Sequence, residues 1–90
     1  MHKKTWKIKL LKSAAKRLKK LDPHVKQEIE KYLRELETLE DPLALGKQLK
    51  GDWAGCYSFR VHKYRIICEP FEEYLLIEVI KVGWRKDVYD

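Results

Sequence analysis

The fold of this chain is decided by residues 56–69, CYSFRVHKYRIICE. Apolar and polar side chains alternate on both sides of the dipeptide His62-Lys63, and alternation with a period of two is typical of β-strands. A two-residue turn at this dipeptide would fold the stretch into a β-hairpin in which Arg60 lies opposite Arg65. The sequence therefore predicts two antiparallel strands joined by a tight turn.

The predicted hairpin has one apolar face and one polar face. Alternate positions of the two strands share the apolar face and are expected in the core: Tyr57, Phe59, Val61, Tyr64, Ile66 and Cys68. The opposite face carries Ser58, Arg60 and Arg65. Because His-Lys is an unfavourable turn dipeptide, a longer loop is the alternative, and it would separate the two arginines.

Two arginines directly opposite each other on a sheet are unexpected, because like charges in this position destabilise strand pairing. A local rule that is broken inside an otherwise consistent sequence indicates a functional position. The planar guanidinium group matches the oxygens of phosphate and carboxylate, so Arg60 and Arg65 are candidates for an anion-binding site. The structural alternative is that their stems cover apolar surface or that they pair with a nearby glutamate.

Length and charge describe one basic domain. Ninety residues make a single domain, residues 1–90, with enough apolar side chains for a modest core. The net charge of +6 favours an acidic partner such as nucleic acid. Residues 2–21 and 42–65 are predominantly basic, whereas acids outnumber bases in residues 22–41, so we expect one basic side and one neutral or acidic side.

The sequence carries no pattern typical of a metal site, a disulfide or a membrane segment. The two cysteines fall on opposite faces of the predicted hairpin, which disfavours a bridge between them and fits a reducing compartment. No Cys-x-x-Cys motif and no zinc-like cluster of cysteine and histidine occurs. No apolar run reaches membrane length, and the first residues are not those of a signal peptide. We expect a soluble cytoplasmic protein that uses no cofactor and binds no membrane.

Two helices are predicted before the hairpin. Apolar residues at helical spacing predict a first helix over residues 14–21, with Ser13 as its N-cap. Asp22-Pro23 predicts the start of a second helix, since an acidic N-cap is followed by proline in the first turn. Helical spacing continues to about Glu40. The short junction predicts a two-helix hairpin.

Two further strands complete the predicted sheet. Alternation predicts a strand over residues 5–10, with Trp6 in the core, and the apolar run in residues 74–82 predicts a strand covered on both faces. Residues 43–55 are expected to be a connection and residues 83–90 a polar tail. The predicted order is β-α-α-β-β-β: an α+β domain in which the two-helix hairpin packs on a mostly antiparallel four-stranded sheet.

Three features of the chain resemble the RelE/ParE superfamily of toxin–antitoxin toxins. The first is this order of elements within ninety residues. The second is Leu49-Lys50-Gly51 followed by residues 57–67, YSFRVHKYRII, which is similar to the core motif of the superfamily. The third is residues 82–89, VGWRKDVY, which is similar to the tail of the RelE branch. The resemblance extends over essentially the whole chain, and the tail is its more specific part.

The RelE-like tail implies a ribosome-dependent mRNA endonuclease (an mRNA interferase) that cleaves in the ribosomal A site. In such a reaction the 2′-hydroxyl attacks the adjacent phosphate and leaves a 2′,3′-cyclic phosphate. By position, the resemblance assigns catalytic roles to Arg60, Arg65, Arg85 and Tyr89. It implies the ribosome and mRNA as targets and a RelB-like antitoxin as the protein partner.

Elementary chemistry gives each of these residues a role. Arg60 and Arg65 would hold the scissile phosphate and stabilise the charge that grows in the transition state. Arg85 would stabilise charge on the leaving oxygen, because a guanidinium scarcely deprotonates. Tyr89 would act as the base if cations lower its pKa, or it would stack on or orient a nucleobase.

Further residues are expected to bind RNA. Lysines contact phosphates through charge and reach alone. Trp84 is suited to stack on a nucleobase, and its alternative is to fold back onto the sheet. The expected RNA-binding residues are Lys47, Lys50, Lys63, Trp84 and Lys86.

Two positions depart from the pattern of the superfamily. Ser58 stands where the RelE toxins have a lysine, and Trp84 stands where many relatives have a histidine. The loss of a cation at position 58 weakens the expectation of catalysis. Two alternatives therefore stay open: a ParE-like inhibitor of DNA gyrase, and a non-catalytic relative that binds the ribosome or RNA.

Overall fold

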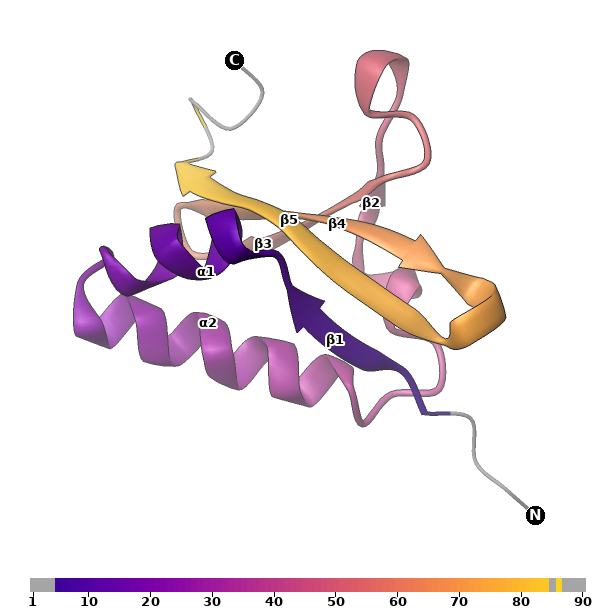
Figure 1. Cartoon of the computed structure of the whole chain (residues 1–90), viewed down its shortest axis with the longest axis horizontal. Helices are drawn as coiled ribbons and strands as arrows, with labels where there is room; N and C mark the ends of the chain where they lie inside the picture. The colour runs from indigo at the N-terminus through magenta and orange to yellow at the C-terminus, as the bar shows by residue number, and fades with distance from the viewer. Residues whose placement is uncertain (1–4, 85, 87–90) are drawn as a thin grey trace.

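Two helices cover one face of a five-stranded sheet in the computed structural model, which describes residues 5–84 and 86 (Figure 1). The elements are β1 (Lys7–Leu10), α1 (Lys12–Lys19), α2 (Pro23–Leu36), β2 (Lys47–Gln48), β3 (Tyr57–Val61), β4 (Tyr64–Phe71) and β5 (Leu76–Trp84). Short 3₁₀ helices, η1 (Pro42–Leu45), η2 (Gly51–Trp53) and η3 (Glu72–Tyr74), lie in the connections. Neither α-helix in this part of the chain is long and apolar enough to cross a membrane.

The strands lie in the order β1-β5-β4-β3-β2. β1 runs parallel to β5, and every other neighbouring pair is antiparallel, which confirms a mostly antiparallel sheet. The expectation of four strands is wrong, because the connection between α2 and the hairpin contains the edge strand β2. A strand of two residues has no detectable alternation, and it forms here because Lys47 pairs with Ser58 and Gln48 with Tyr57.

The register of the β3–β4 hairpin is the predicted one. Arg60 lies opposite Arg65, and Val61 lies opposite Tyr64. The two-residue turn requires a positive φ, and His62 adopts one of 55°. Histidine occurs in this region more often than most other non-glycine residues, so the turn forms although its sequence is unfavourable. A two-residue turn therefore sets which side chains face each other on the two strands.

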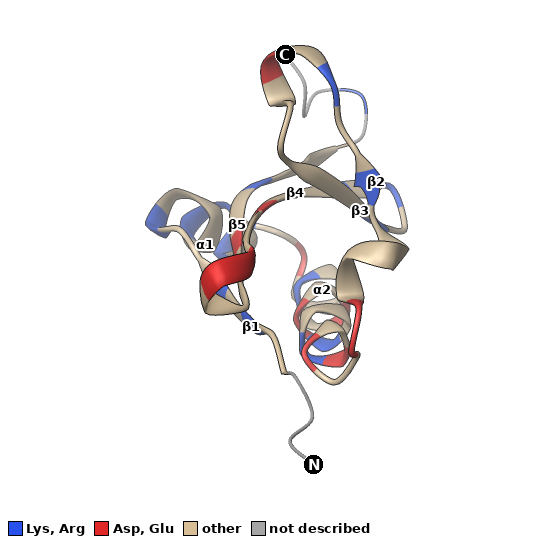
Figure 2. Ribbon diagram, turned by 90° about the vertical axis from the view of Figure 1, so that its right-hand side faces the viewer, with Lys and Arg blue, Asp and Glu red and all other residues tan. Residues whose placement is uncertain are grey.

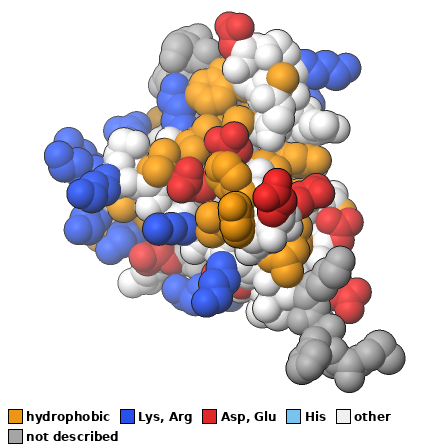
Figure 3. Space-filling model, turned by 45° about the vertical axis from the view of Figure 1, so that its right-hand side comes forward, with side chains coloured by type: hydrophobic (Ala, Val, Ile, Leu, Met, Phe, Trp, Pro, Cys, Tyr) orange, Lys and Arg blue, Asp and Glu red, His pale blue; other side chains and the backbone are white. Residues whose placement is uncertain are grey.

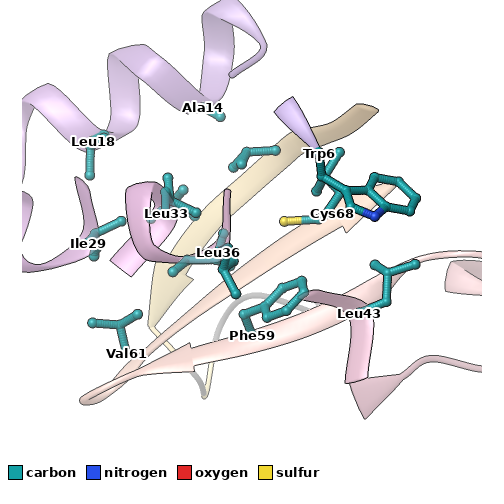
Figure 4. Close-up of a cluster of buried hydrophobic side chains, with 14 residues drawn as sticks. Trp6, Ala14, Leu18, Ile29, Leu33, Leu36, Leu43, Phe59, Val61 and Cys68 are labelled. Atoms are coloured by element: carbon teal, nitrogen blue, oxygen red, sulfur yellow. The ribbon is translucent and has the colours of Figure 1, made fainter. Parts of the chain in front are cut away.

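The core forms between the sheet and the two helices (Figure 4). Phe59, Ile66 and Cys68 of the hairpin are fully buried, and the tyrosines predicted on the same face pack against this cluster. α2 contributes Ile29, Leu33 and Leu36, while Ala14 and Leu18 come from α1. Trp6 is also buried. The predicted apolar face of the hairpin is thus confirmed as the core face.

Both boundaries of α1 and the end of α2 differ from the prediction, since α1 spans residues 12–19 instead of 14–21. α1 begins at Lys12, one residue before the expected cap Ser13, because the backbone N–H of Leu11 still donates to Val79 and extends the pairing of β1 up to the helix. Asp22 caps α2 as predicted and accepts from the backbone N–H of His24. α2 ends at Leu36 instead of near residue 40, and the Thr38 hydroxyl donates to the carbonyl of Glu35 at 2.7 Å. Such a side-chain bond competes with continuation of the helix.

β5 is an interior strand that is covered on both faces, as predicted. Ile77 and Val79 face the helices, whereas Ile80 packs on the other side against a second cluster that contains Cys56 and Ile67. β5 begins at residue 76 and continues to residue 84, so the first residues of the predicted polar tail belong to the strand. The two cysteines are free and lie in separate clusters on opposite faces.

Gly46, the residue before β2, lies close to the hairpin, and its substitution would test this packing. A Cβ at this position would lie 2.9 Å from Cζ and 3.0 Å from Cε1 of the fully buried Phe59 ring. Because the ring cannot move out of a filled core, Gly46→Ala is expected to lower the free energy of unfolding by about 1–3 kcal/mol. The thermal unfolding midpoint, followed by circular dichroism, should fall, while the exposed substitution Ala44→Ser should leave it nearly unchanged. An unchanged midpoint for Gly46→Ala would contradict this packing.

Cys68 provides a second test of the core. Burial raises the pKa of the Cys68 thiol to about 12, and the neighbouring Cys56 adds to the rise. Below that pKa the thiol stays protonated, and because the thiolate is the nucleophile, iodoacetamide should not modify Cys68 of the native protein at pH 8. Modification should appear in urea, where the protein is unfolded. Mass spectrometry of digests would show it, and rapid labelling of native Cys68 would show that the core is open.

Candidate functional site

A basic groove of about 670 Å³ opens on the face of the hairpin opposite the core. Its lining comes from β2, β3 and β4, the residues that precede β2, and one residue beyond β5: Leu45, Gly46, Lys47, Ser58, Arg60, Arg65 and Lys86. Four of these seven described residues are cationic and none is acidic. Figure 2 shows β2, with its basic residue in blue, beside β3 at the edge of the sheet. The groove is therefore a concave surface with convergent positive charge.

Strand pairing places the cations of the groove. Arg60 and Arg65 face each other across β3 and β4, and Lys47 lies opposite Ser58 across β2 and β3. Three neighbouring strands thus each supply a cation to one surface. The predicted placement of Arg60 opposite Arg65 is confirmed. The groove is also lined by Lys47 and Lys86.

Arg65 holds a buried donor without an acceptor. Its Nη1 atom is buried, and no hydrogen-bond partner exists for it in the part of the chain that the structure describes. A buried donor of a charged group that lacks a partner is costly, so such atoms call for an explanation. Because Arg65 lines the groove, an oxyanion bound there would supply the missing acceptor. This observation favours an anion site over a structural role for Arg65.

Arg60 is held by the turn that follows it. Its Nε donates to the backbone carbonyl oxygen of His62 at 3.2 Å. The bond is local, and it fixes the stem of an exposed side chain beside the groove. Sequence patterns do not reveal this bond, because any residue at position 62 has a carbonyl group.

Ser58 is buried, with an exposed fraction of 6%, and it lines the groove between Arg60 and the edge strand. A serine side chain takes up little space, so it leaves the groove open. Lys47, directly opposite on β2, brings a positive charge to the neighbourhood of this position. Since β2 was not predicted, the pairing of Lys47 with Ser58 could not be anticipated from the sequence.

The remaining predicted RNA-binding residues lie outside the groove. Trp84 is opposite Tyr64, which faces the core, so Trp84 shares the helix-covered face. Its ring centroid lies 5.5 Å from that of Tyr64, and Lys63 Nζ lies 5.8 Å from the Trp84 centroid. Trp84 thus packs back on the sheet yet stays 40% exposed. Lys50 precedes η2 and does not line the groove either.

Arg85 and Tyr89 lie outside the described residues, so their predicted roles stay predictions. Within residues 5–84 and 86, no three side chains of histidine, cysteine, aspartate or glutamate are placed to hold a metal ion. The described groove offers positive charge and hydrogen-bond donors, together with the Ser58 hydroxyl. These groups are suited to binding and stabilising an oxyanion.

Charge is also unevenly distributed outside the groove. The last turn of α1 carries Lys16, Arg17 and Lys19, and no acidic residue occurs in its first turn. In Figure 3, Lys and Arg side chains gather at one side of the molecule, while acidic side chains lie around a band of hydrophobic ones. This distribution agrees with the basic and acidic sides expected from the sequence.

The chain matches a known family over nearly its whole length. Residues 8–89 match the family model described as the ParE toxin of the type II toxin–antitoxin system, parDE. No curated protein matches the chain at a significant level of sequence similarity. The family assignment therefore rests on the family model and on the fold.

Several solved structures are similar to this one. The RelBE2 toxin–antitoxin complex from Mycobacterium tuberculosis has a TM-score of 0.82 at 24% identity, covering 91% of this chain and 100% of that chain. The RelB–RelE complex from Methanococcus jannaschii has a TM-score of 0.72 at 28% identity, with 91% and 95% covered. A free E. coli RelE carrying two arginine-to-alanine substitutions has a TM-score of 0.72 at 26% identity, with 90% and 84% covered.

The family model, the order of the elements and the similarity to solved RelE toxins all agree. Together they establish that the chain belongs to the RelE/ParE superfamily of toxins from type II toxin–antitoxin systems.

Proposed function

We propose that the chain is a ribosome-dependent endoribonuclease that cleaves mRNA in the A site, with the basic groove as the site of the scissile phosphate. The observation that carries the proposal is the pair Arg60 and Arg65, of which Arg65 has a buried Nη1 without a described acceptor. A phosphate between the two guanidinium groups would replace their mutual repulsion by two attractive interactions. Charge-assisted hydrogen bonds of this kind are roughly twice as strong as neutral ones.

The groove suits the transition state better than the ground state. When the 2′-hydroxyl attacks, negative charge grows on the phosphate oxygens that do not take part in bond making or breaking. Arg60 and Arg65 would stabilise that charge from fixed strand positions, so no rearrangement is needed as the reaction proceeds. In the proposed site, Lys47 and Lys86 bind the flanking backbone phosphates.

Proton transfer is assigned to the end of the chain. The described part of the groove contains no acidic side chain and no imidazole. In the proposal, Tyr89 as the phenolate takes the proton of the 2′-hydroxyl while the 2′ oxygen bonds to phosphorus. The bond from phosphorus to the 5′ oxygen breaks, Arg85 stabilises the charge on that oxygen, and water protonates it. Correct positioning of the RNA can supply a large share of the rate enhancement, so the ribosome would contribute by holding the mRNA in line for attack.

The residues outside the groove are proposed as peripheral RNA contacts. Lys63 and Trp84 form one cluster with Tyr64 at the tip of the hairpin, where a nucleobase could stack on the exposed part of the indole. Lys50 would contact a phosphate of the same strand or of ribosomal RNA. Lysine contacts of this kind strengthen binding without selecting a sequence.

The proposed protein partner is a RelB-like antitoxin. Two of the similar solved structures are complexes of a toxin with its antitoxin. A chain of net charge +6 with a basic groove favours an acidic segment as the neutralising ligand. In the proposal, such a segment covers the groove and excludes RNA from it.

Gyrase inhibition is the second candidate function, because the matching family model is named for the ParE toxins. A gyrase inhibitor would act by binding, would leave mRNA intact and would induce the DNA-damage response. A non-catalytic relative would bind ribosomes and leave both mRNA and DNA intact. Mapping of mRNA ends in cells that express the protein separates the three functions.

Arg60→Ala and Arg65→Ala are each expected to lower mRNA cleavage by about 10²–10³-fold, since each removes a group that stabilises the transition state. Arg85→Ala and Tyr89→Ala should have comparable effects. Primer extension on a translated mRNA after induction should show cuts in phase with the codons for the parent protein and not for these four variants. Lys26→Ala on α2 removes the same charge at a distance from the groove and should cleave as the parent does. Intact mRNA in cells that the parent protein arrests would contradict the proposal.

Ser58→Lys should strengthen RNA binding by adding one cation to the groove. The groove has room for the longer side chain, and Ser58 already lines it. The slope of log binding constant against log salt should steepen by about 0.7 for each new phosphate contact with single-stranded RNA. Ser58→Met, which has a long uncharged side chain, is the matched control. Equal salt slopes for the lysine and methionine variants would show that position 58 does not face the RNA.

A further inference from the structure

The tip of the β3–β4 hairpin is tied to α2 by a contact between residues far apart in the sequence. Nε2 of His62, in the turn, contacts Oε2 of Glu28 on α2. The other carboxylate oxygen of Glu28 lies 3.1 Å from Nε2 of His24, one helical turn earlier. Glu28 is thus shared by an imidazole on its own helix and an imidazole on the hairpin.

The backbone of His62 has a conformation that is unfavourable for a residue with a side chain. Its φ of 55° lies in the left-handed region, where glycine or asparagine is the usual choice in two-residue hairpin turns. A non-glycine residue in such a conformation persists only when the surrounding structure holds it. The contact with Glu28 is an interaction that glycine could not make. The unfavourable backbone conformation at His62 therefore accompanies a side-chain contact with α2 that glycine would lose.

The same residue also holds Arg60. The His62 carbonyl oxygen accepts a hydrogen bond from Arg60 Nε at 3.2 Å. Arg65, directly opposite, repels Arg60, so an unrestrained Arg60 side chain would move away from the groove toward solvent. The orientation of the His62 peptide thus decides where the Arg60 guanidinium lies.

We propose that Glu28 is a positioning residue for Arg60 and acts through His62. The carboxylate fixes the imidazole, the imidazole fixes the turn, and the turn carbonyl fixes the guanidinium beside the bound phosphate. The proposal rests on the proposed function of the basic groove, to which it adds a residue on α2 that does not line the groove. Two further charged residues of α2, Lys31 and Glu35, line a shallow groove together with Glu28.

RNA affinity is a measure of whether Glu28 positions Arg60, because removal of the Glu28 charge and loss of positioning change the affinity in opposite directions. Removing a carboxylate from a protein that binds RNA should tighten binding slightly. Loss of positioning should instead weaken it, by roughly two- to fivefold for a contact as exposed as this one. Glu30→Ala is the matched control, since it removes the same charge from the opposite side of α2, beside β1. The probe is a short single-stranded RNA with 2′-O-methyl sugars, which cannot be cleaved by attack of the 2′ oxygen.

The experiment measures Glu28→Ala and His62→Gly in the parent and in the Arg60→Ala background. In the parent, both should weaken binding roughly two- to fivefold, while Glu28→Gln, which keeps an oxygen acceptor for the imidazole, should retain most of the affinity. In the Arg60→Ala background neither change should have a further effect. His62→Gly relieves the backbone, so its thermal unfolding midpoint should not fall, and loss of binding then cannot be attributed to unfolding.

Two results would overturn the proposal. The first is that Glu28→Ala binds RNA as Glu30→Ala does. The second is that Glu28→Ala and His62→Gly weaken binding equally with and without Arg60, which would indicate a general structural effect. If Arg60→Ala itself leaves RNA binding unchanged, the proposed function of the groove is wrong, and that outcome is distinguishable from failure of the positioning role alone.

Discussion

Electrostatic repulsion between two opposed guanidinium groups is the constraint around which the site is organised. Arg60 and Arg65 face each other because a two-residue turn sets the register of β3 and β4. They cannot slip apart, since a shift of one residue would bring Phe59 and Ile66 out of the core. The hairpin therefore concentrates positive charge at a position where like charges lower its stability. A phosphate bound there, as proposed, would turn this unfavourable pair into a favourable arrangement.

Three other parts of the fold hold Arg60 and Arg65 in place. The helices fill the core face and so fix the hairpin, while β2 brings Lys47 to the edge of the groove. Gly46 allows that edge strand to approach the ring of Phe59 closely. Third, the contact of Glu28 with the turn links α2 to Arg60. Binding groups and stabilising groups thus occupy opposite faces of the same two strands, which lets the core offset the cost of the charged face.

Residue patterns anticipated the hairpin well because every second side chain must be apolar when one face is buried. The pairing of Arg60 with Arg65 follows from that alternation and from the length of the turn. β2 was missed because two residues show no periodicity and pair only when the rest of the sheet is present. The cap preference of Ser13 was overridden by continued pairing of the preceding strand. Trp84 lies on the face opposite the groove because it pairs with Tyr64, a register that its own sequence neighbourhood does not reveal.

The most direct measurement is the thermal unfolding midpoint at increasing concentrations of a short 2′-O-methyl RNA, for the parent and for the double variant Arg60→Gln/Arg65→Gln. A ligand that binds the native state and not the unfolded state raises the midpoint, and the rise grows with the logarithm of its concentration once the site is largely occupied. If an oxyanion relieves the repulsion between the two guanidinium groups, the parent midpoint rises with RNA concentration. The double variant then starts at a higher midpoint and shows a much smaller rise with RNA, because only the lysine and tryptophan contacts remain. Equal rises for both proteins would contradict the account.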